Sequence, residues 1–398
     1  MTNIYAALEI GTTRTVLAVG EAKSGGRVKV VAHAEIPSAD IRKSQILDIK
    51  SVAQSIKSVL KKIETSQNKD TVQIDIGNAF LVVSGDHVKA DILTGHIEVE
   101  SGKVSQRDME ELTQTTREMC AQKDREVLDV IDLSYTLDRI GGIANPCDMS
   151  GRMLSLDTLR VSADANRIND ARTAANEAHL ELRDPLFAAM CAADSTLDET
   201  EKRNGALVLD LGGGSTGYAA YVNGYPVAAS AIAIGGDHIS SDISYAFQTT
   251  HAVAEELKKR EASAILATSK DLSPRVQLGS SPLIETRTIS RRALNTVVNL
   301  RVKELLGFIR RELENSDLLR QLHAGIVLTG GGAALSGLDA LVQKEFGLPV
   351  RFGKPIHVDG LSEAENPESF AAIAGALMFA HKHYERKPLF SIFKGLFK

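Results

Sequence analysis

Hydrophobic and polar residues follow two different periods along this chain, one typical of helices and one typical of strands. Apolar residues recur at helical spacing in residues 49–63, 168–180 and 297–313. Short apolar runs, which favour strands, occur at residues 4–8 and 208–211. Helices and strands are therefore mixed along the chain, and the pattern predicts α/β domains.

One strand–turn–strand pattern occurs twice. The first copy spans residues 7–19 and the second spans residues 208–221, and each contains a glycine turn between two apolar runs. An acidic residue, Glu9 in the first copy and Asp210 in the second, stands two positions before the first turn glycine. Such self-similarity predicts two domains of like fold that face one another.

A stretch between the two copies does not share their pattern. It contains strand-like runs, a helix that follows a polar cap, and a turn, at residues 80–91, 105–120, 126–137, 145–151 and 152–163. We therefore predict an inserted small α/β subdomain over about residues 84–163.

Length and composition narrow the class of protein. The 398 residues exceed what one ordinary core holds, so two or more domains are expected. A net charge of −5 argues against a nucleic-acid-binding protein. The three cysteines are scattered, which is typical of reduced thiols in the cytoplasm. The start of the chain lacks a basic segment before its first apolar run, and no run of about 18 apolar residues occurs, so we predict neither a signal peptide nor a membrane-spanning helix.

Three glycine-rich turns carry the candidate chemistry. Glycine at such turns lets the backbone approach phosphate oxygens closely, and a following helix N-terminus favours negative charge. A single glycine turn is more often structural, but three in this order favour a nucleotide cleft. The candidate contacts are Gly11, Thr12, Thr13 and Arg14 in the first turn, Gly212, Gly213, Gly214 and Ser215 in the second, and Gly330, Gly331 and Gly332 in the third.

The two acidic residues that precede the first and second turns suggest a metal site. If the two copies face one another, Glu9 and Asp210 lie on opposite sides of one cleft. Mg²⁺ keeps much of its hydration shell in proteins, so we expect these carboxylates to hold it through water. The alternative is that both carboxylates only cap their turns.

The order of these turns resembles that of the actin, sugar-kinase and heat-shock-chaperone superfamily, and further segments resemble its FtsA family. These segments are residues 231–243, 254–258 and 371–376, together with the position of the insertion. The resemblance implies an α/β, actin-like (ribonuclease H-like) two-domain ATPase fold, in which the inserted subdomain replaces actin's equivalent. It also implies that ATP and Mg²⁺ are the ligands, with Gly235 and Gly236 at the nucleotide and Glu255 and Lys258 at the nucleoside.

The same resemblance implies a division of the chain into subdomains. These are IA (1–83, with 164–204 and about 368–384), IC (84–163), IIA (205–245 and 309–367) and IIB (246–308), followed by a C-terminal helix (385–398).

Departures from the superfamily pattern bear on hydrolysis. Glu9 stands where aspartate is commoner, Arg14 where lysine is commoner, and Gly217 where the second turn usually continues with aspartate. Of the residues at the place that orients the attacking water, only Asp184 could serve. The sequence therefore predicts that ATP is bound tightly and hydrolysed slowly or not at all.

The last residues have the pattern of an amphipathic helix that lies on a membrane. Apolar residues recur along one face while lysines lie opposite, and three of the eleven phenylalanines fall in the last nine residues. The alternative is a terminal core helix. The candidate membrane contacts are Leu389, Phe390, Ile392, Phe393, Leu396 and Phe397, with Lys394 and Lys398 toward an anionic membrane surface.

The resemblance also implies partners and a location. An FtsA protein forms filaments, binds the C-terminal peptide of FtsZ and recruits other division proteins at the cytoplasmic face of the inner membrane, at the division site. Arg301, on a basic helix, is the candidate for a carboxylate of the FtsZ peptide. Two alternatives remain at this stage, a PilM-like type IV pilus assembly adaptor and a sugar or acetate kinase.

Overall fold

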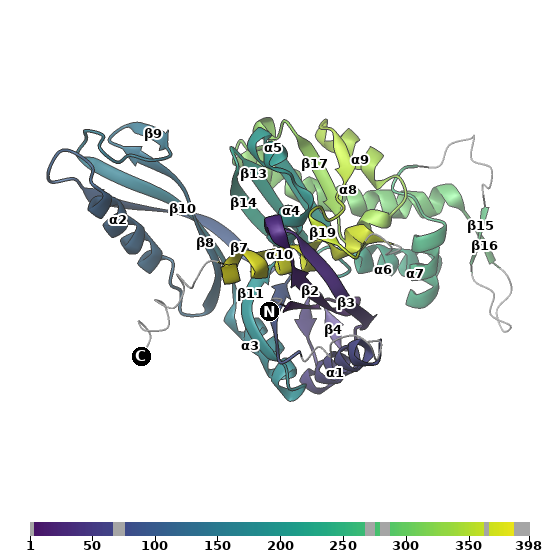
Figure 1. Cartoon of the computed structure of the whole chain (residues 1–398). Helices are drawn as coiled ribbons and strands as arrows, with labels where there is room; N and C mark the ends of the chain where they lie inside the picture. Colours follow the sequence, from purple (N-terminus) through teal and green to yellow (C-terminus); the bar gives the residue numbers. More distant parts are fainter. Residues whose placement is uncertain (1–3, 67–75, 267–274, 279–286, 362–365, 386–398) are drawn as a thin grey trace.

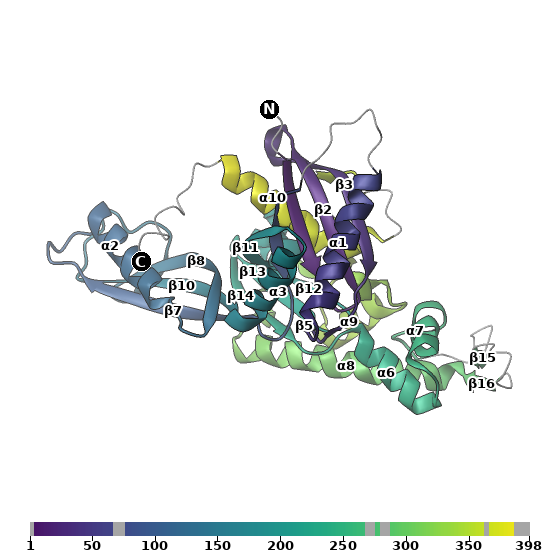
Figure 2. The same cartoon turned by 90° about the horizontal axis from the view of Figure 1, so that it is seen from below.

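The computed structural model describes residues 4–66, 76–266, 275–278, 287–361 and 366–385. Two lobes pack against each other, and a smaller subdomain projects from them to one side (Figures 1 and 2). The first lobe is built on a six-stranded sheet. Its strands, in spatial order, are β11 (Glu181–Phe187), β6 (Asn78–Val83), β1 (Ile4–Ile10), β2 (Arg14–Ala22), β3 (Val28–Pro37) and β19 (Val358–Asp359).

A nine-stranded sheet runs through the second lobe and continues into the projecting subdomain. Five strands belong to the lobe: β18 (Val350–Phe352), β17 (Gly325–Thr329), β12 (Ala206–Leu211), β13 (Thr216–Val222) and β14 (Tyr225–Ile232). Four belong to the subdomain: β7 (Lys89–Glu98), β10 (Met153–Asp164), β8 (Arg125–Leu137) and β9 (Ile140–Ile143). Between strands β14 and β7 the paired residues are Ser230 and Lys89.

The repeat predicted from the sequence is present in the two sheets. In the first lobe β1 pairs antiparallel with β2, β2 antiparallel with β3, and β1 parallel with β6. In the second lobe β12, β13, β14 and β17 have the same relations. The two copies of the strand–turn–strand pattern thus occupy the same place in two like sheets.

Helices cover both sheets. Helices α1 (Ile49–Ser66) and α3 (Ala165–Glu177) pack on one face of the first sheet, against apolar residues such as Leu8 and Leu17. The second lobe and its outer end carry α5 (Glu199–Asn204), α6 (Gly236–Phe247), α7 (His251–Arg260), α8 (Arg291–Asn315) and α9 (Leu338–Phe346). Small hairpins are β4 (Ile41–Arg42) with β5 (Gln45–Ile46), and β15 (Arg275–Leu278) with β16 (Arg287–Ser290). The 3-10 turns are η1 (Ser24–Gly26), η2 (Leu319–Gln321), η3 (Gly331–Ala334) and η4 (Pro367–Phe370).

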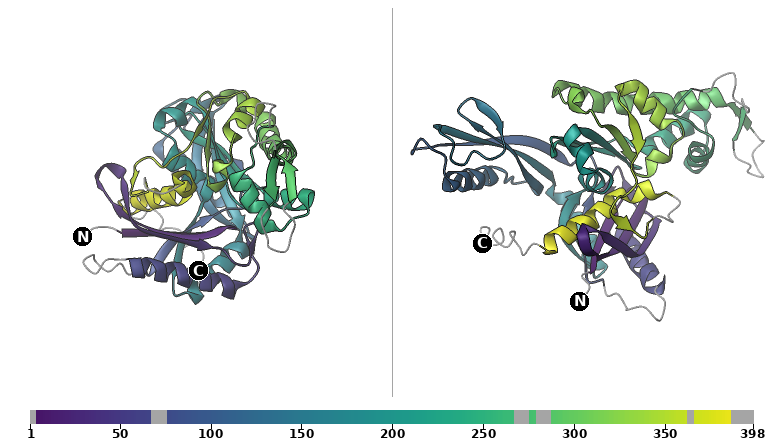
Figure 3. Two further views of the ribbon diagram at one scale, coloured as in Figure 1. Left: turned by 90° about the vertical axis from the view of Figure 1, so that its right-hand side faces the viewer. Right: turned by 45° about the horizontal axis from the view of Figure 1, so that its top comes forward.

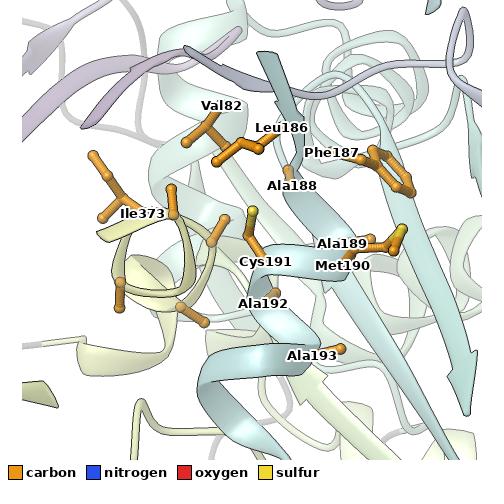
Figure 4. Packing of buried hydrophobic residues seen from close by; sticks show 14 of the residues in the cluster. Val82, Leu186, Phe187, Ala188, Ala189, Met190, Cys191, Ala192, Ala193 and Ile373 are labelled. Atoms are coloured by element: carbon orange, nitrogen blue, oxygen red, sulfur yellow. The ribbon is translucent and has the colours of Figure 1, made fainter. Parts of the chain in front are cut away.

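Two helices rich in small residues lie between the lobes. Helix α10 (Ala371–Glu385) packs on the first sheet, α4 (Ala188–Thr196) packs on the second, and the two helices pack on each other. Figure 4 shows Cys191 and Ala192 of α4 next to Ile373 of α10. A Cβ atom on Gly375 would lie only 1.8 Å from the carbonyl oxygen of Cys191. Glycine at this position therefore sets how closely the two helices, and with them the lobes, approach.

The inserted subdomain has the elements that the sequence predicts, with one correction. Helix α2 (Gln106–Met119) begins after Ser105, whose side chain and that of Asp108 form a capping box. The single strand expected at 80–91 is wrong: β6 and β7 are separate strands, because the chain turns at Gly85, where φ is +121°. This turn is where the chain leaves the first lobe for the subdomain.

Two helices begin earlier than the hydrophobic pattern indicates. Helix α3 begins at Ala165, after Asp164 accepts hydrogen bonds from the Asn166 and Arg167 amides, and α8 begins at Arg291. Their first turns are largely polar and carry little hydrophobic periodicity. The predicted subdomain boundaries remain predictions, and those at 245 and 308 fall within α6 and α8.

In the described part of the chain, no helix combines the length and apolar character needed to cross a membrane. The candidate membrane contacts at 389–398 lie outside the described residues.

Candidate functional site

The first two glycine turns close in the same way. In the turn between β1 and β2 the Gly11 amide donates to the carbonyl of Arg14 (3.0 Å), and in the turn between β12 and β13 the Gly212 amide donates to the carbonyl of Ser215 (3.0 Å). A Cβ atom on either glycine would lie under 3.0 Å from that carbonyl oxygen. The tight turn thus requires glycine at both positions.

The two turns face each other directly across the lobes. A Cβ atom on Gly213 would lie 1.9 Å from Thr13 Oγ1, and one on Gly214 would lie 2.4 Å from Thr12 Oγ1. The bare backbone of the second turn therefore lies against the threonine hydroxyls of the first. Backbone amides and hydroxyls from both lobes converge there, a donor set that suits a phosphate chain.

The third glycine turn and the start of α6 lie beside the second glycine turn. Gly330 has φ of +79°, and a Cβ atom there would lie 2.5 Å from Asp210 Oδ1. The Gly236 amide donates to the carbonyl of Gly212 (3.0 Å), which docks the N-terminus of α6 on the second turn. A helix N-terminus beside glycine turns favours an anion.

One large cavity of about 1000 Å³ lies between the lobes, and both predicted carboxylates and all fifteen predicted nucleotide contacts line it. The views in Figure 3 show the arrangement of the two lobes. The predicted carboxylates and nucleotide contacts that line the cavity are Glu9, Gly11, Thr12, Thr13, Arg14, Asp210, Gly212, Gly213, Gly214, Ser215, Gly235, Gly236, Glu255, Lys258, Gly330, Gly331 and Gly332.

The carboxylates of Glu9 and Asp210 influence each other. Burial raises the pKa of Asp210 to about 7, and the nearby Glu9 charge adds to this rise while Arg14 opposes it. Burial likewise raises the pKa of Glu9, against the effect of Arg14. Two half-buried acids that repel each other gain from a shared cation, so this pair fits a hydrated Mg²⁺.

The described residues contain no cluster of three or more His, Cys, Asp or Glu residues that could hold a metal without other ligands. A cation at Glu9 and Asp210 would therefore complete its shell with water and with oxygens of a bound phosphate chain, as Mg²⁺ commonly does.

Glu255 and Lys258 form a fixed polar pair on α7. Lys258 Nζ donates to Glu255 Oε2 (2.6 Å) and to the carbonyl of Gly236 (3.0 Å), and Ser240 donates to the same carboxylate (2.5 Å). Burial raises the pKa of Glu255, but the hydrogen bonds from Lys258 and Ser240 outweigh it and bring the pKa to about 2. The pair holds α7 against the phosphate-side turn at the start of α6.

Two predicted arginine contacts have partners within the protein. Arg14 pairs with Glu35 (2.5 Å) and stacks over the ring of Phe370 (4.9 Å to the centroid). Arg301 lines the same cavity, and its guanidinium binds both carboxylate oxygens of Asp242 at 2.6 and 2.9 Å. Arg301 Nη1 also pairs with Glu304, so a carboxylate of a partner peptide could use the fork of Arg301 only by displacing Asp242 or Glu304.

The structure does not bring Asp184 to the cavity. Asp184 is exposed on β11, whereas the end of that strand reaches the cavity with Phe187, and Ala188 follows it. The pKa of Arg172 on α3 is raised mainly by a hydrogen bond to Glu126, and Asp184 adds to it, which places Asp184 toward α3. The prediction that Asp184 orients an attacking water is therefore corrected.

Further polar residues line the cavity that the sequence analysis did not single out. They are His33, Glu35, Ser44, Lys62, Ser84, Thr216, Asp237, Lys259, Asn366 and Ser369. Asp237 directly follows the Gly235–Gly236 pair, which was already a predicted nucleotide contact, so its position in the sequence could have pointed to the cavity. Ser44 belongs to no motif, and only its contacts reveal it.

Two like lobes around one cleft, with a subdomain inserted in the first, define an actin-like two-domain protein. The family model for cell division protein FtsA matches residues 207–375, and that for the SHS2 domain inserted in FtsA matches residues 85–162. The cell division protein FtsA of Pseudomonas aeruginosa is 30% identical over 374 residues, which cover 94% of this chain and 88% of that protein. FtsA of Escherichia coli K12 is 29% identical over 390 residues, covering 96% and 91%. The chain belongs to the FtsA family of cell division proteins.

Solved structures share the fold at low sequence identity. A PilM–PilN type IV pilus biogenesis complex matches with a TM-score of 0.63 at 17% identity, covering 95% of this chain and 98% of the other. MreB5 of Spiroplasma citri bound to ADP matches with a TM-score of 0.54 at 16% identity, covering 96% and 99%. At these identities the likeness shows the fold alone, and the predicted actin-like fold class is confirmed.

Proposed function

We propose that this protein binds ATP with Mg²⁺ in the cleft between its lobes. The observation that carries the proposal is the direct opposition of two glycine turns, each closed by the same hydrogen bond, over one cavity of about 1000 Å³. A cavity of that size accommodates a nucleotide, since ligand pockets span roughly 300–1,000 Å³. The MreB5 structure with bound ADP belongs to the same fold and supports the choice of ligand.

Each group has a role in this proposal. The amides of the first and second turns bind the phosphates, and Thr12, Thr13 and Ser215 add hydroxyl donors. Glu9 and Asp210 hold Mg²⁺ through water, and the ion neutralises charge on the phosphates. Glu255 and Lys258 lie at the nucleoside, with the third glycine turn on its other side.

We propose further that hydrolysis is slow or absent. Among the described residues, the acids that line the cavity are Glu9, Glu35, Asp210, Asp237 and Glu255, and no glutamine of these ranges lines it. Glu35 and Glu255 are paired with Arg14 and Lys258, and Glu9 and Asp210 are assigned to the metal. The remaining acid, Asp237, has a shorter side chain than the glutamate or glutamine that orients the attacking water in hydrolases of this superfamily. At Gly217, where the superfamily commonly has aspartate, the backbone packs against Ala189 and Phe187.

Replacing Asp210 by asparagine is expected to weaken binding of Mg·ATP about tenfold and to leave binding of metal-free ATP within about twofold, because one charge-assisted contact is lost. Titration of a fluorescent ATP analogue with Mg²⁺ and with EDTA measures both. The matched control is Asp184→Asn, which removes an equal charge outside the cavity and should change neither value. Failure of the wild-type chain to bind ATP at millimolar concentration would refute the proposal.

At the level of the cell, we propose that the protein assembles with copies of itself and tethers the C-terminal peptide of FtsZ to the cytoplasmic face of the inner membrane, where it recruits other division proteins. Membership of the FtsA family and the amphipathic pattern of 387–398 support this. One short helix binds lipid weakly, but many tails on one assembly add their affinities. The likeness to PilM rests on fold alone and does not favour the pilus alternative.

Deleting residues 387–398 is expected to abolish co-sedimentation with anionic vesicles while ATP binding stays unchanged, because the apolar face that enters the lipid is removed. A labelled FtsZ C-terminal peptide should pellet with the vesicles only when the full chain is present. A pilus inner-membrane peptide serves as the control ligand. Pelleting of the truncated chain with lipid would show that the membrane contact lies elsewhere.

A further inference from the structure

A small hairpin lies across both phosphate turns. We call residues 40–47, which contain β4 and β5, the strap. The Ser44 amide donates to Thr12 Oγ1 (2.9 Å), and the Ser44 hydroxyl lies 3.2 Å from the hydroxyl of Ser215. A Cβ atom on Gly214 would lie 3.0 Å from Lys43 Cα. The strap thus contacts the glycine turns of both lobes, although it belongs to the first.

The strap is held in an unusual backbone conformation. Asp40, Lys43 and Ser44 have φ of 55°, 50° and 59°, a region that residues other than glycine seldom adopt. Its base is fastened by a hydrogen bond from the Leu47 amide to the carbonyl of Asp40 (2.8 Å). Such conformations persist only where surrounding contacts impose them, so a change at the turns is expected to alter the strap.

The other side of the strap contacts residues 84–88, which lead into the inserted subdomain and which we call its root. A Cβ atom on Gly85 would lie 2.8 Å from Ser44 Cβ and 3.0 Å from the ring of His87. Residues 84–88 join β6 of the first lobe to β7 of the subdomain. The carbonyl of His87 accepts a hydrogen bond from Arg125 (2.8 Å) on β8, and Arg125 also binds the Ser162 hydroxyl (2.9 Å) on β10. Ser44 therefore contacts the segment that leads into β7, and Arg125 links that segment to the start of β8 and the end of β10.

The strap has room to move. A cavity of about 40 Å³ lies beneath it, lined by Ile41, Ser44 and Ile46 from the strap and by His87 from the root. That volume is enough for about two or three water molecules. The side chain of Ser44 is thus not packed solidly against the first lobe.

Lys43 supplies a charge that a phosphate could engage. Lys43 is exposed and forms no ion pair with any residue in the described ranges. Its backbone lies against the second glycine turn, since a Cβ atom on Gly214 would lie 3.0 Å from Lys43 Cα. Burial lowers the pKa of His238 at the start of α6, and the charge of Lys43 adds to this, which agrees with that position. An unpaired cation beside two phosphate-binding turns is suited to the terminal phosphate of a nucleotide.

We propose that the strap senses the terminal phosphate of ATP and couples it to the orientation of the inserted subdomain, with Ser44 as the positioning residue. The proposal rests on the ATP site proposed above. A bound triphosphate draws Lys43 and fixes the turns that Ser44 contacts. The strap then shifts over the small cavity and moves Gly85, and the hydrogen bonds of Arg125 to His87 and Ser162 carry this movement into the subdomain.

The test measures ATP affinity and the position of the subdomain on the same full-length samples. Spin labels are placed on Cys147 in the subdomain and on a cysteine introduced by Lys57→Cys, an exposed position of α1. Cys120 and Cys191 are buried, and burial raises the pKa of both thiols, so they react slowly. Pulsed distance measurements are made with and without Mg·ATP.

Three variants test the proposed steps separately. Ser44→Ala should weaken ATP binding about 3- to 10-fold, the effect of one lost hydrogen bond, and should abolish the ATP-dependent distance change even at saturation. Arg125→Gln, at a residue that does not line the cavity, should keep wild-type affinity and also lose the distance change. Ser38→Ala removes the hydrogen bond to Thr15 Oγ1 (3.0 Å), which lies within the first lobe, and should keep both properties. Thermal melting of each variant checks that it is folded.

The outcomes distinguish the two proposals. ATP binding by the wild-type chain without any distance change overturns the strap proposal alone. A full distance change in Ser44→Ala at saturating ATP, or its equal loss in Ser38→Ala, overturns it as well. Absence of ATP binding by the wild-type chain overturns both proposals, and the affinity measurement shows it directly.

Discussion

Replacing Gly213 by valine is expected to weaken ATP binding about 100-fold or more while the protein stays folded. A Cβ atom there would lie 1.9 Å from Thr13 Oγ1 and 3.5 Å from Asp237 Oδ1, in the space where the two glycine turns converge. The branched side chain holds the turns apart, so the phosphates lose hydrogen bonds from one of them. Two lost bonds to a charged group cost about 3–6 kcal/mol together, which corresponds to about 100-fold or more in affinity.

The fold should tolerate this change because the close atoms belong to side chains and not to the backbone. Gly213 is not among the glycines with positive φ, so a side chain there does not require the left-handed backbone conformation that residues other than glycine avoid. The matched control is Gly307→Val on α8, where a Cβ atom meets nothing within 4 Å. Titration with a fluorescent ATP analogue gives both affinities. If Gly213→Val binds within about threefold of the wild type, the two turns do not hold one phosphate chain.

Much of the fold and of the cleft could be predicted, because a backbone that approaches phosphate closely requires particular residues at positions near each other in the sequence. Gly11 and Gly212 are required by their own turns, and Glu9 and Asp210 stand at a fixed offset from them. These features lie within a few residues of each other. The capped helix of the inserted subdomain is likewise marked locally, by Ser105 and Asp108.

The features that were missed depend on contacts between distant segments. Arg301 lies on a visibly basic helix, but its partner Asp242 is 59 residues away and on another helix. Asp184 lies at the expected offset in the sequence, yet the position of β11 in the sheet brings Phe187 to the cavity in its place. The strap was missed for the same reason, since Ser44 gains its role from residues near positions 12, 85 and 215 together.

Replacing Gly375 by alanine is expected to lower the free energy of unfolding by about 3 kcal/mol, the upper part of the usual range for an overpacked core. The added Cβ atom would lie 1.8 Å from the carbonyl oxygen of Cys191 and 2.8 Å from its Cα, so it meets the backbone of α4. Backbone cannot move aside as a flexible side chain does, and α4 and α10 must separate. Chemical denaturation, compared at equal denaturant dependence, measures the loss.

The matched control is Gly307→Ala, the same substitution in another helix. Nothing lies within 4 Å of a Cβ atom at Gly307, so alanine there should raise stability by roughly 0.5–1 kcal/mol through helix propensity alone. The two substitutions are thus predicted to have opposite signs. Equal effects at Gly375 and Gly307 would show that the helices between the lobes are not held at this contact.

The substitution at Gly375 should also weaken ATP binding, although Gly375 does not line the cavity. Helix α10 packs on the first sheet and α4 on the second, so the distance between these helices fixes the distance between the two glycine turns. If about 1.4 kcal/mol of binding energy is then needed to draw the lobes together again, affinity falls about tenfold. If the variant is less stable but binds ATP with wild-type affinity, closure of the cleft does not depend on how closely α4 packs on α10.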